Sequence, residues 1–255
     1  EQNIKLENNK WRDFKFGVYL LGDYNILTVN CDLDMGHLKL KTSHLWIAKT
    51  CYISCSKLGY PSEKGPGKGE NGSKELRGGG GASYGTKGRT FNFVNSHGKN
   101  GQLYGENTLL KEIHFGSGGG RAKYKSYPLK GGNGGGIIEI IVQQQIINDG
   151  CIECDGDCGI CMSYLGGLKN VGAGGGSGGS ILIVVQAPSN VPQKFGVINC
   201  LGRGRAGHGR IAIYTRCNMR YRSISAMPSC YLSSLIPKEE FIMKRDRNVL
   251  QTSNN

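Results

Sequence analysis

Gly172-Ala173-Gly174-Gly175-Gly176-Ser177-Gly178-Gly179-Ser180-Ile181-Leu182-Ile183-Val184-Val185 sets a run of small residues directly against a run of aliphatic ones. The aliphatic half predicts a buried β-strand. Glycine lacks Cβ, so the other half can adopt positive φ and can let a second main chain approach closely. Of the 42 glycines in the chain, 39 lie between Gly59 and Gly209. This distribution predicts tightly stacked main chain.

The pairing of glycine with a strand recurs along the chain. Gly134–Val142 and Gly207–Tyr214 are two further glycine-led strands, and Ile152–Gly156 and Ile198–Gly202 share the form Ile-x-Cys-x-Gly, with Ile53–Cys55 as a looser copy. Similar strands that begin again about 30 to 45 residues apart are typical of a solenoid. We predict an all-β fold, a right-handed parallel β-helix or similar solenoid, with the repeated cysteine facing inward. A β-sandwich with glycine-rich loops is the alternative.

The N-terminal part of the chain, from Trp11 to Tyr60, alternates apolar and polar residues in short runs and predicts further strands. These are Tyr24–Val29, Leu38–Lys41, Leu45–Ile47 and Tyr52–Cys55. Residues 60–130 are polar and glycine-rich, and we expect this insertion to leave the coils on one side. Its Gly78–Gly85 run fits a flexible linker or close-packed polyglycine strands. The predicted domains are a solenoid over residues 1–216 and a basic cap or arm over 217–255, with mobile last residues.

The charge balance favours a polyanionic partner, because the formal net charge is +13. The segment Gly202–Arg210 alternates glycine and arginine in the manner of RNA-binding tracts, although a solvated loop between two coils has the same composition. Acidic glycan is the preferred polyanion and nucleic acid is less favoured. The candidate polyanion-binding residues are Arg203, Arg205, Arg210, Arg216, Arg220 and Arg222.

Ten cysteines form an even set, which fits an oxidising extracellular setting better than the cytosol. All ten are disulfide candidates: Cys31, Cys51, Cys55, Cys151, Cys154, Cys158, Cys161, Cys200, Cys217 and Cys230. The compact group Cys151, Cys154, Cys158 and Cys161 offers a weaker alternative, a zinc site. Its central spacer is shorter than that of a zinc ribbon, so no metal is expected.

Secretion or attachment to a surface is the expected localisation. The chain has no apolar run of transmembrane length, and its Glu1–Gln2 start suggests a processed N-terminus. Asn71-Gly72-Ser73 is a glycosylation acceptor triplet in a turn-rich stretch, which makes Asn71 the candidate glycosylation site.

The residue patterns of common enzymes are not found in this sequence. The five histidines are dispersed without metal-ligand spacing, and the acidic residues do not cluster. We therefore expect no catalytic residue and no cofactor. The favoured function is a structural or adhesive extracellular protein that self-associates into a filament or surface layer, or that joins other matrix proteins. A binding module for acidic polysaccharide or nucleic acid is the alternative, and a polysaccharide-active enzyme is the minor one.

Four segments, taken in order, resemble glycine-rich β-helix-like repeat proteins found as secreted and surface proteins of protists and bacteria. They are residues 78–85, 131–142, 172–185 and 207–214, and the likeness extends over about residues 25 to 215. Gly172–Ile181 and Gly209–Tyr214 match the family's patterns closely. The resemblance implies β-helical extracellular architecture without established catalytic residues. A fainter, compositional likeness is to the glycine-rich ectodomain region of the anaplastic lymphoma kinase type of receptor.

Two departures from this family pattern bear on function. Cysteine stands where the family has a small residue, at Cys55, Cys154 and Cys200, which predicts stacked thiols or disulfides inside the coil. Basic residues stand where the family often has acidic ones, so a calcium-dependent role is not expected.

Overall fold

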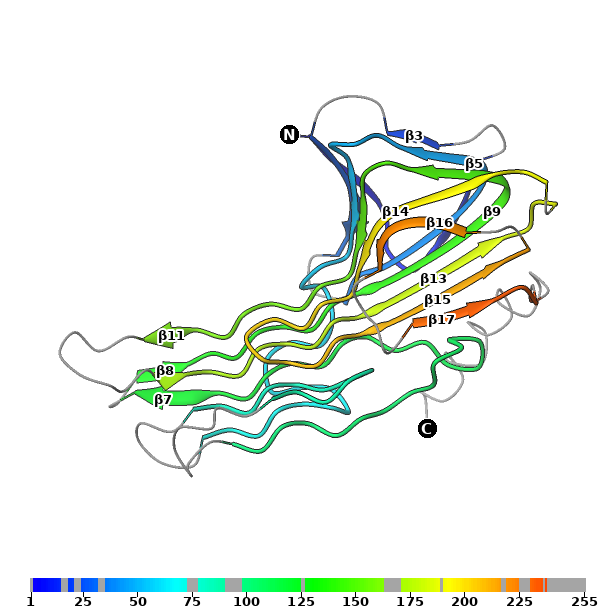
Figure 1. Ribbon diagram of the computed structural model, residues 1–255. Coiled ribbons are helices and arrows are strands. Elements are labelled where there is room, and N and C mark those ends of the chain that lie inside the picture. Colours follow the sequence, from blue (N-terminus) through cyan, green and yellow to red (C-terminus); the bar gives the residue numbers. More distant parts are fainter. Residues whose placement is uncertain are drawn as a thin grey trace, which may run out of the picture.

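The computed structural model describes residues 2–14, 18–20, 24–31, 35–72, 78–89, 98–124, 127–162, 171–188, 190–216, 219–224, 230–235 and 237. Every regular element among these residues is a β-strand, and thirteen strands form one large sheet (Figure 1). All strand pairs of this sheet among the described residues are parallel. The predicted all-β class is confirmed, and the parallel pairing is consistent with a solenoid-like fold.

One set of strands, called row A, lies side by side in the order in which the chain reaches them. Row A comprises β2 (Trp11–Phe14), β5 (His37–Ile47), β9 (Ile137–Asn148), β13 (Ser180–Val185), β15 (Arg210–Thr215) and β17 (Cys230–Ser233). The glycine-led strands start in register, because Ser180 pairs with both Ile137 and Arg210. The second half of β5 also pairs with β3 (Val18–Leu20).

A second set, called row B, is built in the same way. Row B comprises β1 (Gln2–Glu7), β4 (Asn25–Asn30), β6 (Tyr52–Ser54), β10 (Cys151–Glu153), β14 (Gln193–Asn199) and β16 (Met219–Ile224). The two rows join where Ile147 at the end of β9 pairs with Lys194 at the start of β14. The chain visits the rows alternately, and β16 and β17, which fall in the predicted C-terminal arm, continue them.

The core lies between the rows and repeats from strand to strand. In row B, Ile53, Ile152 and Ile198 stand in register, and each is completely buried. The core side of row A carries eight further buried aliphatic residues: Leu38, Leu40, Ile138, Ile140, Ile181, Ile183, Ile211 and Ile213. Alternation along each strand thus places one ladder of aliphatic side chains inside the sheet.

The glycine-rich segments leave the sheet between the end of a row B strand and the start of the next row A strand. They run side by side away from it as a long bundle (Figure 1). This glycine bundle comprises residues 59–72, 78–89, 98–102, 116–121, 130–136, 154–160, 172–179 and 201–209. Two antiparallel pairs, β7 (Ala122–Tyr124) with β8 (Tyr127–Leu129) and β11 (Cys161–Met162) with β12 (Val171–Gly172), lie at its far end. Residues 60–130, the expected insertion, supply part of this bundle, and the glycine-rich segments that follow them supply the rest.

Hydrogen bonds in the glycine bundle repeat every three residues. Within residues 174–179, donors three apart bond to the same neighbouring segment, so three neighbours are used in turn. The donor–acceptor pairs are Gly174–Gly120 with Ser177–Ser117, Gly175–Gly204 with Gly178–Gly207, and Gly176–Asp157 with Gly179–Cys154. A β-strand would use two sides with a period of two. The period of three is that of an extended polyproline-II-type helix, which has no internal hydrogen bonds.

Close approach of main chains, more than unusual φ, explains why this bundle needs glycine. Among the described glycines only Gly65, Gly105 and Gly204 have positive φ. By contrast, a Cβ on Gly174 would lie 1.8 Å from the carbonyl oxygen of Gly80, far inside van der Waals contact. Of the two properties expected from the sequence, space for a second backbone is the one used throughout.

Residues 103–115, called the cover segment, pack on the outer side of row A. Leu109 is completely buried there against Leu182, Val184, Ala212 and Tyr214. Two side chains of row A also hold its main chain, because the hydroxyl of Tyr214 donates to Thr108 O (2.8 Å) and that of Ser180 to His114 O (2.6 Å). The cover segment therefore shields one face of the sheet.

Candidate polyanion-binding surface

Arg210, one of the predicted polyanion-binding residues, is buried beneath the cover segment. Its Nη2 donates to the carbonyl oxygens of Tyr104 (2.7 Å) and Gly105 (3.2 Å), and its Nη1 donates to Asn107 Oδ1. The guanidinium carbon lies 5.3 Å from the centroid of the Tyr84 ring. This corrects the prediction for Arg210: the side chain is buried, its Nη1 and Nη2 donors bond to the chain, and its Nε is buried without a partner, so the residue is an internal anchor that a polymer cannot reach.

Arg203 also serves the fold. Its Nη2 lies 2.7 Å from Oδ2 of Asp155, a carboxylate that is nearly completely buried and that also accepts the N–H of Leu201. A buried charge needs such a partner, because its desolvation is costly. Roughly half of the Arg203 side chain nevertheless remains exposed to solvent.

The other predicted arginines do not form one cluster with these two. Arg205 is exposed at a turn of the glycine bundle, whereas Arg216 is exposed at the opposite end of β15. A strand of six residues separates them by roughly 20 Å. Arg220 and Arg222 belong to β16, farther along the chain. The arginines that are close in sequence are therefore distributed over the length of the molecule.

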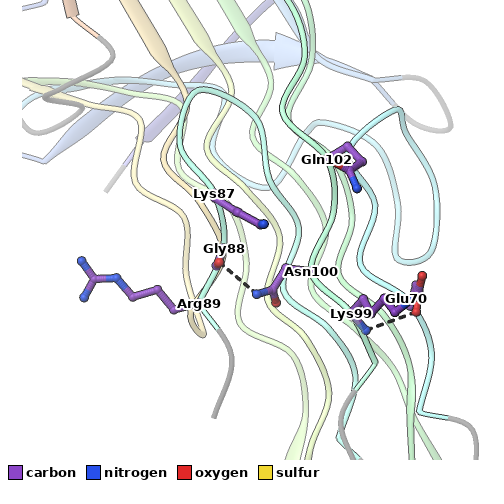
Figure 2. Close-up of a pocket in the computed structure, with 7 residues that line it drawn as sticks. All are labelled: Glu70, Lys87, Gly88, Arg89, Lys99, Asn100 and Gln102. Carbon is purple, nitrogen blue, oxygen red and sulfur yellow. Dashed lines mark hydrogen bonds between the residues drawn. The ribbon is translucent and has the colours of Figure 1, made fainter. Parts of the chain in front are cut away.

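A different set of basic residues surrounds a hollow of about 630 Å³ at the side of the glycine bundle (Figure 2). Its described lining residues are Glu70, Lys87, Gly88, Arg89, Lys99, Asn100 and Gln102. Lys87 points across the hollow toward residues 99–102, whereas Arg89 extends away from the other labelled side chains (Figure 2). The described lining thus carries three cationic residues and one carboxylate, and the Arg89 guanidinium extends beyond the hollow. We call this site the basic hollow.

Asn100 fixes the two sides of the basic hollow relative to each other. Its Nδ2 donates to Gly88 O (2.9 Å), and its Oδ1 accepts the N–H of Gly81 (3.1 Å). On the same side, the N–H of Lys99 donates to Oε2 of Glu70 at 3.3 Å. The lysines therefore stand on a backbone that is already held by hydrogen bonds.

The basic surface continues from the hollow toward Arg205. The N–H of Arg89 donates to Arg205 O (2.8 Å), and both residues line a small adjoining pocket. Burial and the charge of Arg89 lower the pKa of His208, and these two effects outweigh the nearby charge of Asp155, which raises it. His208 is therefore mainly neutral near pH 7, and its Nδ1 accepts the N–H of Gly202 (3.2 Å).

Three of the ten predicted disulfide cysteines form a buried ladder. Cys55, Cys154 and Cys200 follow directly on β6, β10 and β14 and are completely buried. Main-chain bonds keep them in step, since Cys55 N–H donates to Glu153 O and Cys154 N–H to Asn199 O. Burial raises the pKa of the Cys55 thiol and, together with Cys200, that of Cys154. The inward position expected for these cysteines agrees with the structure, and they stack as thiols.

The remaining described cysteines also form no disulfide in the structure. Cys51 and Cys151 are buried, Cys31 and Cys230 are partly buried, and Cys158 and Cys161 are exposed, while Cys217 lies outside the described residues. The four cysteines of the zinc alternative have different surroundings, since Cys151 and Cys154 are buried whereas Cys158 and Cys161 are exposed. No group of three or more potential ligands comes together among the described residues.

Thiol titration can test this arrangement directly. We expect DTNB to modify Cys158 and Cys161 in the native protein, because the accessible thiolate is the reactive form. The stacked Cys55, Cys154 and Cys200 should react only after unfolding. In denatured protein that has never been reduced, all ten cysteines of the chain should titrate. A shortfall of two or more thiols would reveal a disulfide and overturn the stacked-thiol arrangement.

Asn71, the predicted glycosylation residue, is exposed, and Ser73 of its triplet lies outside the described residues. The Asn71 amide donates to Oε2 of Glu63 (2.8 Å), and its oxygen accepts the N–H of Arg121 (2.7 Å). Burial raises the pKa of Glu63, but hydrogen bonds from Asn71 and Arg121 outweigh it and lower the pKa below its usual range. The side chain thus has a structural role in addition to any glycan.

Sequence reasoning missed the basic hollow because its residues are ordinary when taken singly. Lys87, Arg89 and Lys99 are interleaved with glycine in a stretch whose composition also suits a linker. Only the hydrogen-bonded stacking of residues 78–89 beside 98–102 brings them together. The sequence signal for this site is the glycine that lies beside Lys87, Arg89 and Lys99, which suggests that the segments carrying them can pack closely.

Within the described residues there is no helix of the length and apolarity that crossing a bilayer requires. Comparisons with protein-family models, with curated proteins and with solved structures found no match.

Proposed function

We propose that the chain is a non-enzymatic structural or adhesive protein, secreted or attached to a surface, that associates with itself or with other matrix proteins. The observation that supports this proposal is the stacking itself. Rows of parallel strands continue into a bundle in which main chains bond directly to one another along three directions. Such a scaffold is rigid because few rotatable side chains separate its backbones.

The finer fold in this proposal is a right-handed parallel β-helix. Rows A and B, joined by the β9–β14 contact, would form the walls of successive coils. Each coil would release its glycine-rich segment at the same corner. The register of the glycine-led strands supports this arrangement over a sandwich, whose strands would be mainly antiparallel.

Self-association would occur through the strands at the two ends of the sheet order, β1 and β17. Edge strands present backbone groups that a further strand can pair with. Ile4 on β1 and Leu232 on β17 are both about 40% exposed, so apolar contact could accompany strand pairing. The partner in this proposal is a second copy of the chain.

Sedimentation over a concentration series, combined with electron microscopy, tests the assembly. Native protein should form particles or filaments larger than a monomer, and Ile4→Lys and Leu232→Lys should shift the distribution toward monomer. Leu103→Lys is the matched control, since Leu103 is also an exposed apolar residue but lies outside the end strands. A monomer at every concentration, or an equal effect of all three variants, would reject assembly through the ends.

Binding of an acidic polymer is the second candidate function, and the basic hollow favours it. Cations outnumber carboxylates there by three to one in the described lining. The two functions are compatible, because a rigid matrix protein can carry a polymer on its flank. Retention on an acidic matrix at about 150 mM salt, with steep loss of binding as salt rises, is the expected result.

A further inference from the structure

The basic hollow has features of a built site in which side chains from two segments meet. Lys87 comes from residues 78–89, and Lys99 and Gln102 come from residues 98–102. All three side chains are exposed. Asn100 ties the two segments together through hydrogen bonds on both sides of its amide. The backbone that carries the cations is thus held in place, which lowers the ordering cost of binding.

The electrostatics of the hollow favour an anion. Within the described part of the chain, no ion pair forms on Lys87, Arg89 or Lys99. The single lining carboxylate, Glu70, accepts the main-chain N–H of Lys99. Converging positive charges raise the local concentration of anions and speed their arrival.

The chemistry of the described lining favours acidic polysaccharide over nucleic acid. Proteins that hold single-stranded nucleic acid combine a basic groove with aromatic rings on which bases stack. The described lining of the hollow consists of cationic, amide, glycine and carboxylate groups, with no aromatic ring among them. Cations with amide groups beside them match sulfate, carboxylate and hydroxyl groups of a sugar chain.

We propose that the basic hollow binds an acidic polysaccharide, with Lys87 and Lys99 contacting its sulfate or carboxylate groups and Gln102 its hydroxyls. Arg89 and Arg205, linked by a main-chain hydrogen bond, extend the track along the glycine bundle. The proposal rests on the second candidate function, and it adds a location and a ligand class. Nucleic acid is the competing ligand that the experiment must exclude.

The test compares a variant of the hollow with a charge-matched control. Lys87→Ala/Lys99→Ala removes the two facing lysines, and Lys49→Ala/Lys130→Ala removes two exposed lysines elsewhere. Binding to heparin, to polygalacturonate and to a single-stranded RNA is measured at several salt concentrations. We expect the hollow variant to lose about fivefold to tenfold in affinity for at least one polysaccharide, with a shallower salt dependence. The control should change less than twofold, and thermal unfolding should show that all proteins are folded.

Each outcome decides a separate point. Equal losses in both variants would overturn the hollow as the site while leaving polyanion binding in place. Tighter binding of RNA than of either polysaccharide, lost in the hollow variant, would overturn the ligand class. No retention of the unsubstituted protein on any of the three polymers at about 150 mM salt would reject the second candidate function itself.

Discussion

Gly174→Ala is expected to lower the free energy of unfolding by about 3 kcal/mol or more, among the largest effects of any single methyl group in this chain. Gly174 lies where three segments of the glycine bundle meet. Its N–H donates to Gly120 O, and its carbonyl oxygen accepts the N–H of Gly132, each at 2.9 Å. The new Cβ would lie 1.8 Å from Gly80 O and 3.0 Å from Gly120 N. Backbone atoms cannot rotate away, so the segments must separate and lose hydrogen bonds.

Gly172→Ala is the matched control, two residues earlier on the same segment. Among the described residues, a Cβ there would meet only the Cys161 side chain, with its sulfur at 2.8 Å. Cys161 is exposed and can change rotamer, so the expected cost is below about 1 kcal/mol. Urea denaturation and amide exchange of residues 116–136 measure the difference. Similar stability of the two variants would mean that the bundle is not close-packed.

The strands could be predicted from the sequence because their signal is local. Aliphatic runs such as Ile181–Val185 and Ile211–Tyr214 are buried on both faces and contain the β-branched residues that strands favour. The inward cysteine could also be predicted, since the Ile-x-Cys spacing puts both side chains on one face of a strand. These features need only a period of two.

The organisation of the glycine bundle could not be predicted, because glycine carries no side-chain pattern. A flexible linker and a three-direction hydrogen-bonded bundle have the same composition. The two differ in the hydrogen-bond partners of each segment. In the bundle, for example, the N–H of Gly80 donates to Glu70 O and the N–H of Gly79 donates to Gly172 O. These partners lie roughly ten to ninety residues apart in sequence, and their pairing depends on the sheet bringing every segment out at one place.

The same limitation explains the errors in the candidate site. Arg210 belongs to an arginine–glycine tract and would be exposed if the tract were a loop. The sheet instead places it at the start of β15, and the cover segment then closes over it. The lysines of the basic hollow could not be predicted as a site, because they are separated in sequence and come together only in the folded chain.

Arg210→Met should be the most damaging substitution of an arginine among the described residues. It keeps much of the side-chain volume but removes the donors that satisfy Asn107 Oδ1 and the carbonyl oxygens of Tyr104 and Gly105. Hydrogen bonds from a charged donor contribute about 1.5–3 kcal/mol each, and Gly105 and Asn107 are exposed enough to bond to water instead, so we expect a loss of about 2–5 kcal/mol in unfolding free energy. Arg216→Met, at an exposed arginine six residues later, should change it by less than about 0.5 kcal/mol.

The position of Arg210 also predicts that the cover segment is the part of the chain that opens first in the Arg210→Met variant. The cover segment is held at residues 104–107 by Arg210 and at Thr108 by the hydroxyl of Tyr214. Trypsin cleavage after Lys111, an exposed residue of the cover segment, should therefore accelerate strongly in Arg210→Met and only modestly in Tyr214→Phe, which loses one hydrogen bond. If Arg210→Met and Arg216→Met were cleaved at the same rate, the guanidinium would not be an anchor. Arg210 would then return to the set of residues available for an acidic polymer.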